Sequence, residues 1–95
     1  MSLVYEREMT ITHKEFLRLL PKALRDRAYS QKGNEITVRI ENNSVLINLS
    51  EQSIRKIASL ELPVTTIRIE LIGFEKNESI NFMSRFDLAF QKGGG

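Results

Sequence analysis

The residues of this sequence that could do chemistry are few, and their spacing matches no catalytic motif. His13 is the single histidine, and there is no cysteine. Covalent or acid–base catalysis needs a nucleophile beside a base, and a metal site needs a cluster of ligands. The sequence supplies neither, and it contains no HExxH, P-loop or GxGxxG pattern. We therefore expect no enzymatic activity, no cofactor and no metal site.

The titratable residues have plainer interpretations. Glu6 and Glu8 share one face of an expected strand, and Glu75 and Glu78 fall in an expected loop. Either pair could bind a cation weakly, but a solvated surface accounts for both. His13 stands at an expected helix start, where a local hydrogen bond accounts for it.

A basic stripe is the first candidate binding site. Lys14, Arg18, Lys22 and Arg25 are spaced four, four and three residues apart, which places them on one face of a helix. Such a stripe could bind phosphates or an acidic partner. A solvated helix face, with Glu15 nearby to balance the charge, is the alternative. No aromatic residue shares this helix face with the basic ones, which disfavours single-stranded nucleic acid.

The Gly93-Gly94-Gly95 ending is the second candidate. It resembles the tails of ubiquitin-like modifiers and of the sulfur carriers of thiamine and molybdopterin synthesis. This resemblance implies a carrier in which Gly94 and Gly95 thread into an activating enzyme. In those families the tail follows a strand of a β-grasp fold, whereas here it follows an expected helix. The alternative is a helix stop with a flexible end over residues 93–95.

The outer face of the expected sheet is the third candidate. Its positions are mostly polar, but Leu46 and Ile72 are apolar. An uncovered sheet face can pair with another protein or with its own copy. Arg39, Leu46 and Arg68 are the residues that would test such an interface, and a face covered by water is the alternative.

The element that must position these residues is the stretch from Ser59 to Phe74. From Thr66 onward, apolar and polar residues alternate up to Gly73, which is typical of a strand with one buried face. We expect this strand to be central, with two amphipathic helices over its apolar side.

The N-terminal part predicts a strand, a helix and a loop. Residues 3–11 alternate, but Arg7 interrupts the apolar face, so we expect an edge strand. Thr12 and Glu15 form a capping box that starts a helix, and Pro21 should kink or split this helix. Residues 28–34 are expected to be a loop with a turn at Gly33-Asn34.

A β-hairpin follows, with a specific register. Residues 35–41 and 45–49 alternate, and Asn42-Asn43 suits the positive φ values of a two-residue turn. A slip of one residue would move every side chain to the other face. The expected pairs are Ile40 with Val45, Val38 with Ile47 and Ile36 with Leu49.

Residues 51–62 are ambiguous. A helix here would bury Ile54 and Ile57. We favour a short turn at residues 51–53 and then a strand, which would pair back onto the central strand through a turn at residues 62–65 with Pro63 at its first corner. Leu60 would then face Ile67, and Ala58 would face Ile69.

The last helix is expected to start at a cap on Asn77 or Ser79 and to end near Lys92. Its apolar stripe contains Phe82, Phe86 and Phe90, which should dominate the core. The element order is therefore β-α-β-β-(β)-β-α, an α+β domain over residues 1–92 with an antiparallel sheet of four to five strands and two helices on one face.

Two resemblances follow from these patterns. The element order resembles that of TATA-box-binding-protein-like or helix-grip domains. The ending RFDLAFQKGGG is similar to that of small uncharacterised bacterial proteins. Neither resemblance implies an activity.

Composition sets the remaining expectations. The chain has 95 residues, 41% of them hydrophobic and 27% charged, with a net charge of +2. This balance is ordinary for a soluble domain and too weakly basic to require nucleic acid. We expect no membrane span, because no apolar run approaches the ~20 residues needed, and no signal peptide, because residues 1–10 lack its basic-then-apolar pattern. We expect a cytoplasmic binding or interaction module for a protein partner, a second copy or a small anionic ligand, with the carrier function as the alternative.

Overall fold

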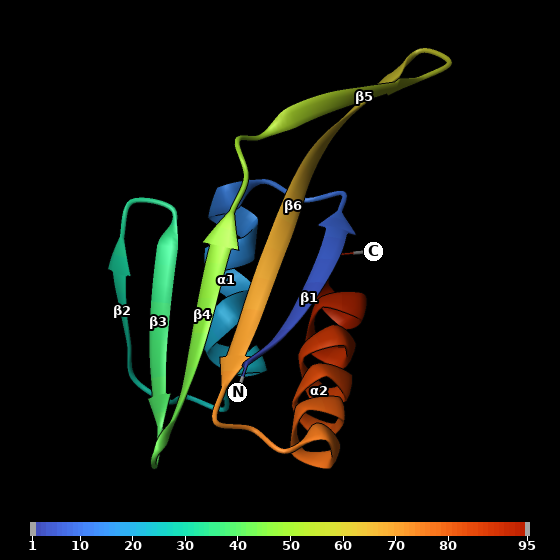
Figure 1. The fold of residues 1–95 in the computed structure, drawn as a ribbon. Coiled ribbons are helices and arrows are strands. Elements are labelled where there is room, and N and C mark those ends of the chain that lie inside the picture. Colours follow the sequence, from blue (N-terminus) through green and yellow to red (C-terminus); the bar gives the residue numbers. More distant parts are fainter. Residues whose placement is uncertain (1, 95) are drawn as a thin grey trace.

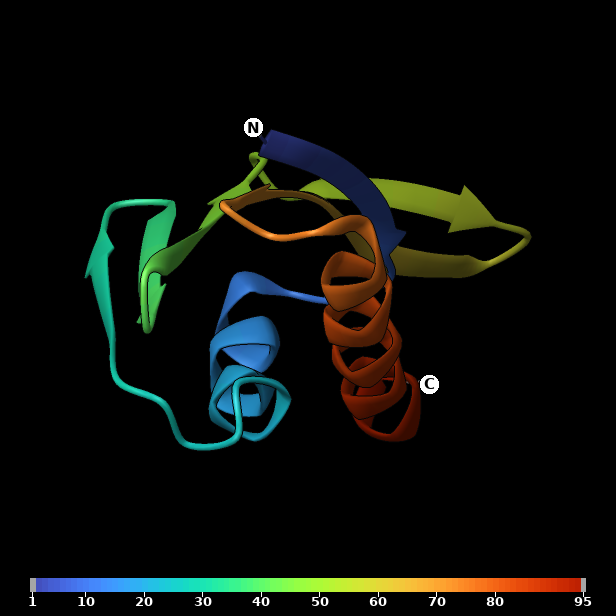
Figure 2. The same cartoon turned by 60° about the horizontal axis from the view of Figure 1, so that its bottom comes forward.

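The computed structural model describes residues 2–94, which form an α+β domain with an antiparallel sheet of six strands. The sheet order is β1-β6-β4-β3-β2, and β5 pairs with β6. Both helices cover one face of the sheet (Figure 1, Figure 2). The elements are β1 (Ser2–Met9), α1 (His13–Ala23), β2 (Tyr29–Lys32), β3 (Glu35–Ile40), β4 (Asn43–Leu49), β5 (Ser53–Ile57), β6 (Leu60–Ile72) and α2 (Lys76–Gly94).

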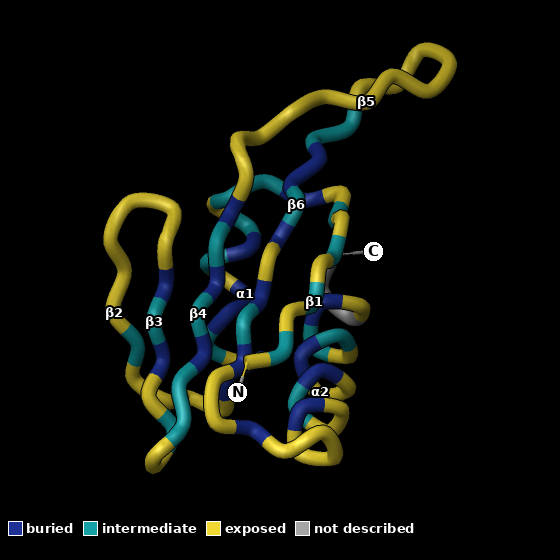
Figure 3. Tube along the Cα trace, in the orientation of Figure 1, coloured by how far each residue is buried: buried dark blue, intermediate teal, exposed yellow. Residues whose placement is uncertain are grey.

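The core lies between the helices and the sheet. Ile67, Ile69 and Leu71 of β6 are fully buried, which confirms the predicted interior strand. The rings of Phe16 and Phe90 stack with their centroids 4.8 Å apart, so α1 and α2 meet through aromatic side chains. Along the sheet, buried residues alternate with more exposed ones, whereas β5 is exposed throughout (Figure 3). The burial needed for stability is therefore concentrated away from β5.

The edge strand β1 is attached to α2 by polar side chains. Within residues 2–94, its residues pair with β6 alone, as expected for an edge strand. Arg7 interrupts the inward face because its guanidinium binds both carboxylate oxygens of Asp87, at 3.0 and 3.1 Å. The hydroxyl of Tyr5 lies 3.0 Å from that of Ser79. Arg7, which interrupts the apolar alternation of β1, is thus paired with Asp87 on α2.

The helix ends differ in part from the predicted ones. The Thr12 hydroxyl accepts a hydrogen bond from the Glu15 N–H at 3.1 Å, as predicted, but the Glu15 carboxylate binds Arg18. α1 contains Pro21 and ends at Ala23, without a second helical segment. The predicted cap of α2 at Asn77 or Ser79 is wrong. The helix begins at Lys76, and the Glu75 N–H just before it donates to Glu78 Oε1 at 2.8 Å. α2 also runs to Gly94 rather than Lys92, and Gly95 lies outside the described residues.

The strand β2 lies where a loop was expected. Gly33-Asn34 is the predicted turn, but it closes a hairpin in which Lys32 pairs with Glu35. β2 has polar residues at three of its four positions, and it is exposed at the sheet edge. Hydrophobic alternation cannot reveal such a strand, since it buries almost nothing.

The predicted register of the β3–β4 hairpin is wrong by two residues. Val38 pairs with Val45 and Ile36 with Ile47, and the turn is Glu41-Asn42 rather than Asn42-Asn43. Glu41 takes the positive φ of 56°. A turn that begins one residue earlier changes the pairing by two, which keeps every side chain on its face. Matching apolar faces therefore could not distinguish the two registers.

The strand option for residues 51–62 is confirmed, but its turn was misplaced. β5 begins at Ser53 and turns back at Ala58-Ser59, so Ile57 pairs with Leu60 and Ile54 with Pro63. Pro63 lies inside β6, at a point where this strand has a strand partner on one side only, a position that tolerates proline. The predicted pairs of Leu60 with Ile67 and Ala58 with Ile69 do not form.

Candidate functional site

A projecting arm, formed by β5, its turn and the first five residues of β6 (residues 53–64), is the most unusual surface of the protein. Figure 1 shows it extending beyond the rest of the sheet. It contains three large apolar side chains that are mostly exposed: Ile54 at 65%, Ile57 at 51% and Leu60 at 60%. Ile57 and Leu60 pair across the hairpin and share one face of the ribbon, whereas Ile54 pairs with Pro63 on the other face. Because large apolar side chains are usually exposed singly, the face that carries Ile57 and Leu60 indicates a contact surface.

The arm has an unpaired edge on each side. Within residues 2–94, β5 pairs with β6 alone, and the β6 residues of the arm pair with β5 alone. β1 reaches only to the pair of Met9 with Thr65. The ribbon therefore presents backbone donors and acceptors as well as apolar side chains, which is the surface that strand-to-strand association requires.

The base of the arm is fixed to the body by several hydrogen bonds. Two hydrogen bonds of 2.9 Å join Ser50 to Thr66. The Ser50 N–H donates to the Thr66 carbonyl, and the Thr66 N–H donates to the Ser50 Oγ. The Thr65 hydroxyl donates to the Ile11 carbonyl at 2.9 Å. Arg55 forms an ion pair with Glu8 of β1. The arm is therefore held in direction at its root.

His13 belongs to this base. Its Nε2–H donates to the Ser50 carbonyl at 2.7 Å, and its backbone N–H donates to Gln52 Oε1 at 3.2 Å. The predicted local hydrogen bond is therefore a long-range one, which joins the start of α1 to the segment before β5. Among the described residues, no group of three or more His, Cys, Asp or Glu could hold a metal ion.

The predicted basic stripe is divided by the fold. Lys14, Arg18 and Lys22 lie exposed on α1, but Arg25 lies beyond the helix end, with a φ of 56°. Arg18 is engaged by Glu15, whose hydrogen bond lowers the pKa of the Glu15 carboxyl and raises the pKa of Arg18. The four residues therefore do not form one continuous row of free charges.

The outer sheet face is mixed in character. Leu46 lies half-buried between Thr37 and Glu70 on the neighbouring strands. Arg68 pairs across strands with Asn48 and lies 3.7 Å from Glu70. Arg39 lies opposite Ser44, toward the turn that closes the β3–β4 hairpin. The three predicted test residues share this face without forming one apolar patch.

The remaining predicted residues have separate outcomes. Glu8 forms an ion pair with Arg55, and Glu78 accepts a hydrogen bond from the Glu75 N–H. Gly94 belongs to α2, so an extended tail would have to begin after it, and Gly95 lies outside the described residues. The carrier hypothesis stays a prediction. Within residues 2–94, neither helix combines the length and the apolar character that crossing a bilayer requires.

Sequence reasoning missed the arm as a site. The signal was present in the residues Ile54, Ile57 and Leu60. The helix alternative would have buried Ile54 and Ile57, and the strand alternative placed Leu60 opposite Ile67, whereas Leu60 pairs with Ile57. A scan against protein-family models, a search of curated proteins and a search of solved structures each gave no match.

Proposed function

We propose that this protein is a protein-interaction module that associates with a second copy of itself through the arm. The observation that carries this proposal is the exposure of Ile54, Ile57 and Leu60 on a ribbon of two strands. Complete burial of one such side chain contributes about 1.5–3 kcal/mol relative to full exposure. Ile57 and Leu60 pair across the hairpin and share one face of the ribbon, so a partner that covers this face buries both of them.

The construction of the arm supports the same proposal. An isolated two-stranded hairpin is only marginally stable in water, and a third strand or a packed surface normally stabilises it. The body of the protein fixes the root of the arm through Ser50 and Thr65 but leaves the strand β5 exposed over its whole length. A partner that packs on the arm would supply the missing support.

A second copy is the partner that fits the charges of the arm. Arg55 and Lys56 carry positive charge, Glu61 carries negative charge, and Arg55 is already paired with Glu8. Two arms can therefore approach without strong repulsion between like charges. A two-fold arrangement in which each arm covers the other is closed after two copies and does not grow further.

The outer sheet face, with Arg39, Leu46 and Arg68, is the second surface we test for association. Half-buried Leu46 shares this face with the exposed Val4 and Ile72 on β1 and β6. The cytoplasm stays the expected compartment, since a chain without cysteine needs no oxidising environment.

Sedimentation of the purified chain over a range of concentrations tests the proposal. We expect a reversible dimer that is lost when charges replace Ile57 and Leu60. A chain that stays monomeric at millimolar concentration would contradict it. If Leu46→Asp abolishes the dimer and the arm substitutions do not, the sheet face is the interface and the arm is not.

A further inference from the structure

A basic pocket lies at the end of the molecule opposite the arm, where the end of α1, the β3–β4 turn and the start of α2 meet (Figure 1). It has a volume of about 310 Å³. Arginines from two separate segments line it, namely Arg25 and Arg27 after α1 and Arg85 on α2. We propose that this pocket binds a small organic anion, a phosphate or carboxylate group on a short apolar body. This site is independent of the proposed association through the arm.

The positive charge extends into a neighbouring hollow. This second hollow has a volume of about 200 Å³, and Lys22 lines it together with Arg25 and Arg85. Since Arg25 and Arg85 line both hollows, they form the wall between them. An anion at this wall is within the field of both guanidinium groups and of the ammonium group of Lys22.

The arginines of the pocket are available for a ligand. Within residues 2–94, the ion pairs that form involve the other arginines Arg7, Arg18, Arg55 and Arg68. Of the two acidic residues that line the pocket, Glu78 already accepts the hydrogen bond of the Glu75 N–H at 2.8 Å. Three guanidinium groups thus face two carboxylates, which leaves positive charge for a ligand to neutralise.

The backbone places Arg25 in the pocket at a conformational cost. The Asp26 N–H donates to the Pro21 carbonyl at 2.8 Å, and the Arg25 N–H donates to the Lys22 carbonyl at 3.2 Å. This pair of bonds is the Schellman motif, and the position of Arg25 in it is normally glycine because φ is positive. Here φ is 56°. An arginine is thus kept where glycine would be less strained.

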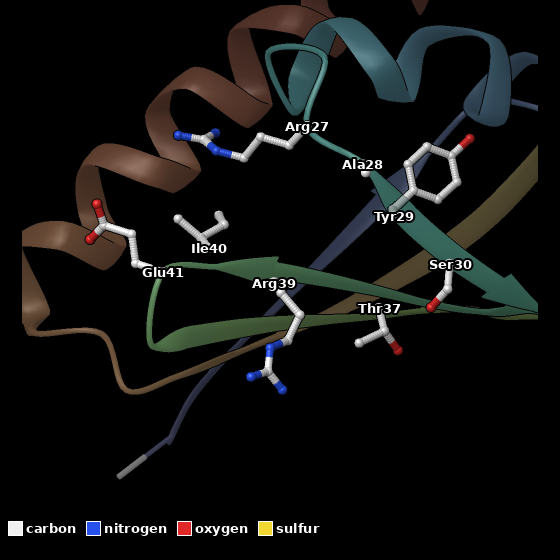
Figure 4. Close-up of a pocket in the computed structure, with 8 residues that line it drawn as sticks. All are labelled: Arg27, Ala28, Tyr29, Ser30, Thr37, Arg39, Ile40 and Glu41. Atoms are coloured by element: carbon white, nitrogen blue, oxygen red, sulfur yellow. The ribbon is translucent and has the colours of Figure 1, made fainter.

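Arg27 is oriented toward the same side. Its Nη1–H donates to the Leu24 carbonyl at 3.2 Å, which leaves other donors of the guanidinium free. Figure 4 shows the adjoining hollow, of about 580 Å³, with Arg27 and Glu41 on the helix side of β3 and Arg39 directed to the opposite side. Arg39 therefore belongs to the outer sheet face and not to the arginine group.

The lining also defines the body of the ligand. Ile40, Phe74 and Phe82 contribute apolar surface to the pocket, and the amides of Asn43 and Asn81 contribute hydrogen-bonding groups. Guanidinium groups bind phosphate and carboxylate through paired N–H donors. A volume near the lower end of ligand pockets limits the ligand to a small molecule. An oxyanion with an aromatic or short aliphatic body satisfies both parts of the lining.

Calorimetric titration of the full chain with phenyl phosphate tests this site, with inorganic phosphate as the probe for the head group alone. We expect phenyl phosphate to bind about tenfold more tightly than phosphate. Arg25→Gly and Arg85→Gln should each weaken its binding by about tenfold or more. Arg18→Gln removes one charge from α1 outside the pocket, and it should change binding by less than about twofold.

The controls separate this proposal from its alternatives. Arg25→Gly relieves the positive φ, so its unfolding temperature should not fall, and lost binding cannot result from unfolding. Charging the arm at Ile57 and Leu60 should leave phenyl phosphate binding unchanged, whatever it does to association. If phenyl phosphate shows no saturable binding, the proposal is overturned. It is also overturned if Arg18→Gln and Arg85→Gln weaken phenyl phosphate binding equally, because the attraction is then diffuse electrostatics and not a pocket. Equal affinity for phosphate and phenyl phosphate would overturn the assignment of the apolar body.

Discussion

Asn43 lies so close to Gly73 that a Cβ atom added to Gly73 would stand 2.6 Å from the Asn43 Oδ1 atom. Gly73 also has a φ of 88°, in a region that glycine adopts without steric cost. The first residue of β4 thus packs against the residue that follows β6. This contact holds Asn43 in β4, so Asn43 is not part of the turn. We attribute to this contact the position of the turn at Glu41-Asn42, one residue earlier than predicted.

Gly73→Ala should reduce the free energy of unfolding by about 1–2 kcal/mol for the positive φ, and further by the cost of moving the Asn43 side chain away from the added Cβ. Gly33→Ala is the matched control. Gly33 has a φ of 61°, and a Cβ there would meet nothing within 4 Å, so only the backbone cost applies. Urea denaturation of both variants checks the difference, and equal losses would contradict the role of Asn43.

Phe86→Ala should cost about 3–5 kcal/mol of stability, because the ring is fully buried among Phe16, Phe82 and Phe90. Leu88→Ala on the same helix should change stability by less than about 0.5 kcal/mol, since Leu88 is exposed. Thermal unfolding followed by circular dichroism measures both variants. Similar midpoints for the two would argue against the aromatic core.

Arg25→Gly should raise the free energy of unfolding by about 0.5–1 kcal/mol, because glycine removes the steric cost of positive φ at the end of α1. Arg25→Ala removes the same charge but keeps the Cβ, so it should give no such gain. Chemical denaturation compares the variants. A gain from alanine as large as that from glycine would show that charge, and not backbone strain, limits stability there.

The pKa of Glu15 should lie below the ordinary glutamate value, because the Arg18 guanidinium donates hydrogen bonds to its carboxylate. A lowered pKa in the folded state means that the contribution of this group is present at neutral pH. This contribution to stability is lost as the pH falls below the Glu15 pKa of the unfolded state and then through the lowered Glu15 pKa of the folded state. NMR titration of Arg18→Gln should show the Glu15 pKa return upward, and an unmoved pKa would refute this cause.

The sequence allowed the fold class to be predicted because alternation and amphipathicity report burial directly. The interior strand around Ile67 and the aromatic stripe of α2 bury large side chains, so their patterns are strong. β2 buries almost nothing and therefore leaves no pattern, although a Gly-Asn pair before residues 35–40 is a two-residue hairpin signal that could have revealed it.

The errors in register and in the arm have a common physical origin. Alternation fixes which face a side chain occupies, but it does not distinguish registers that differ by two residues. The contact of Asn43 with Gly73, to which we attribute the β3–β4 register, joins residues far apart in the sequence. Leu60 was expected to pair with Ile67 on the body, because sequence alone gives no reason to expose it. The arginine pocket is likewise assembled from distant segments.

The measurement that tests the proposed association most directly is sedimentation equilibrium from micromolar to millimolar concentration. We expect the mass to rise from the chain mass of 11.0 kDa toward twice that value. Ile57→Lys combined with Leu60→Glu should hold it at the monomer, while the new charges face each other across the hairpin and preserve the arm.

The matched control places the same charges on α2, as Ile80→Lys combined with Leu88→Glu, at apolar residues of similar exposure. This variant should dimerise like the unmodified chain. If the unmodified chain stays at 11.0 kDa throughout, or if the arm variant still dimerises, the arm is not the surface through which two copies associate.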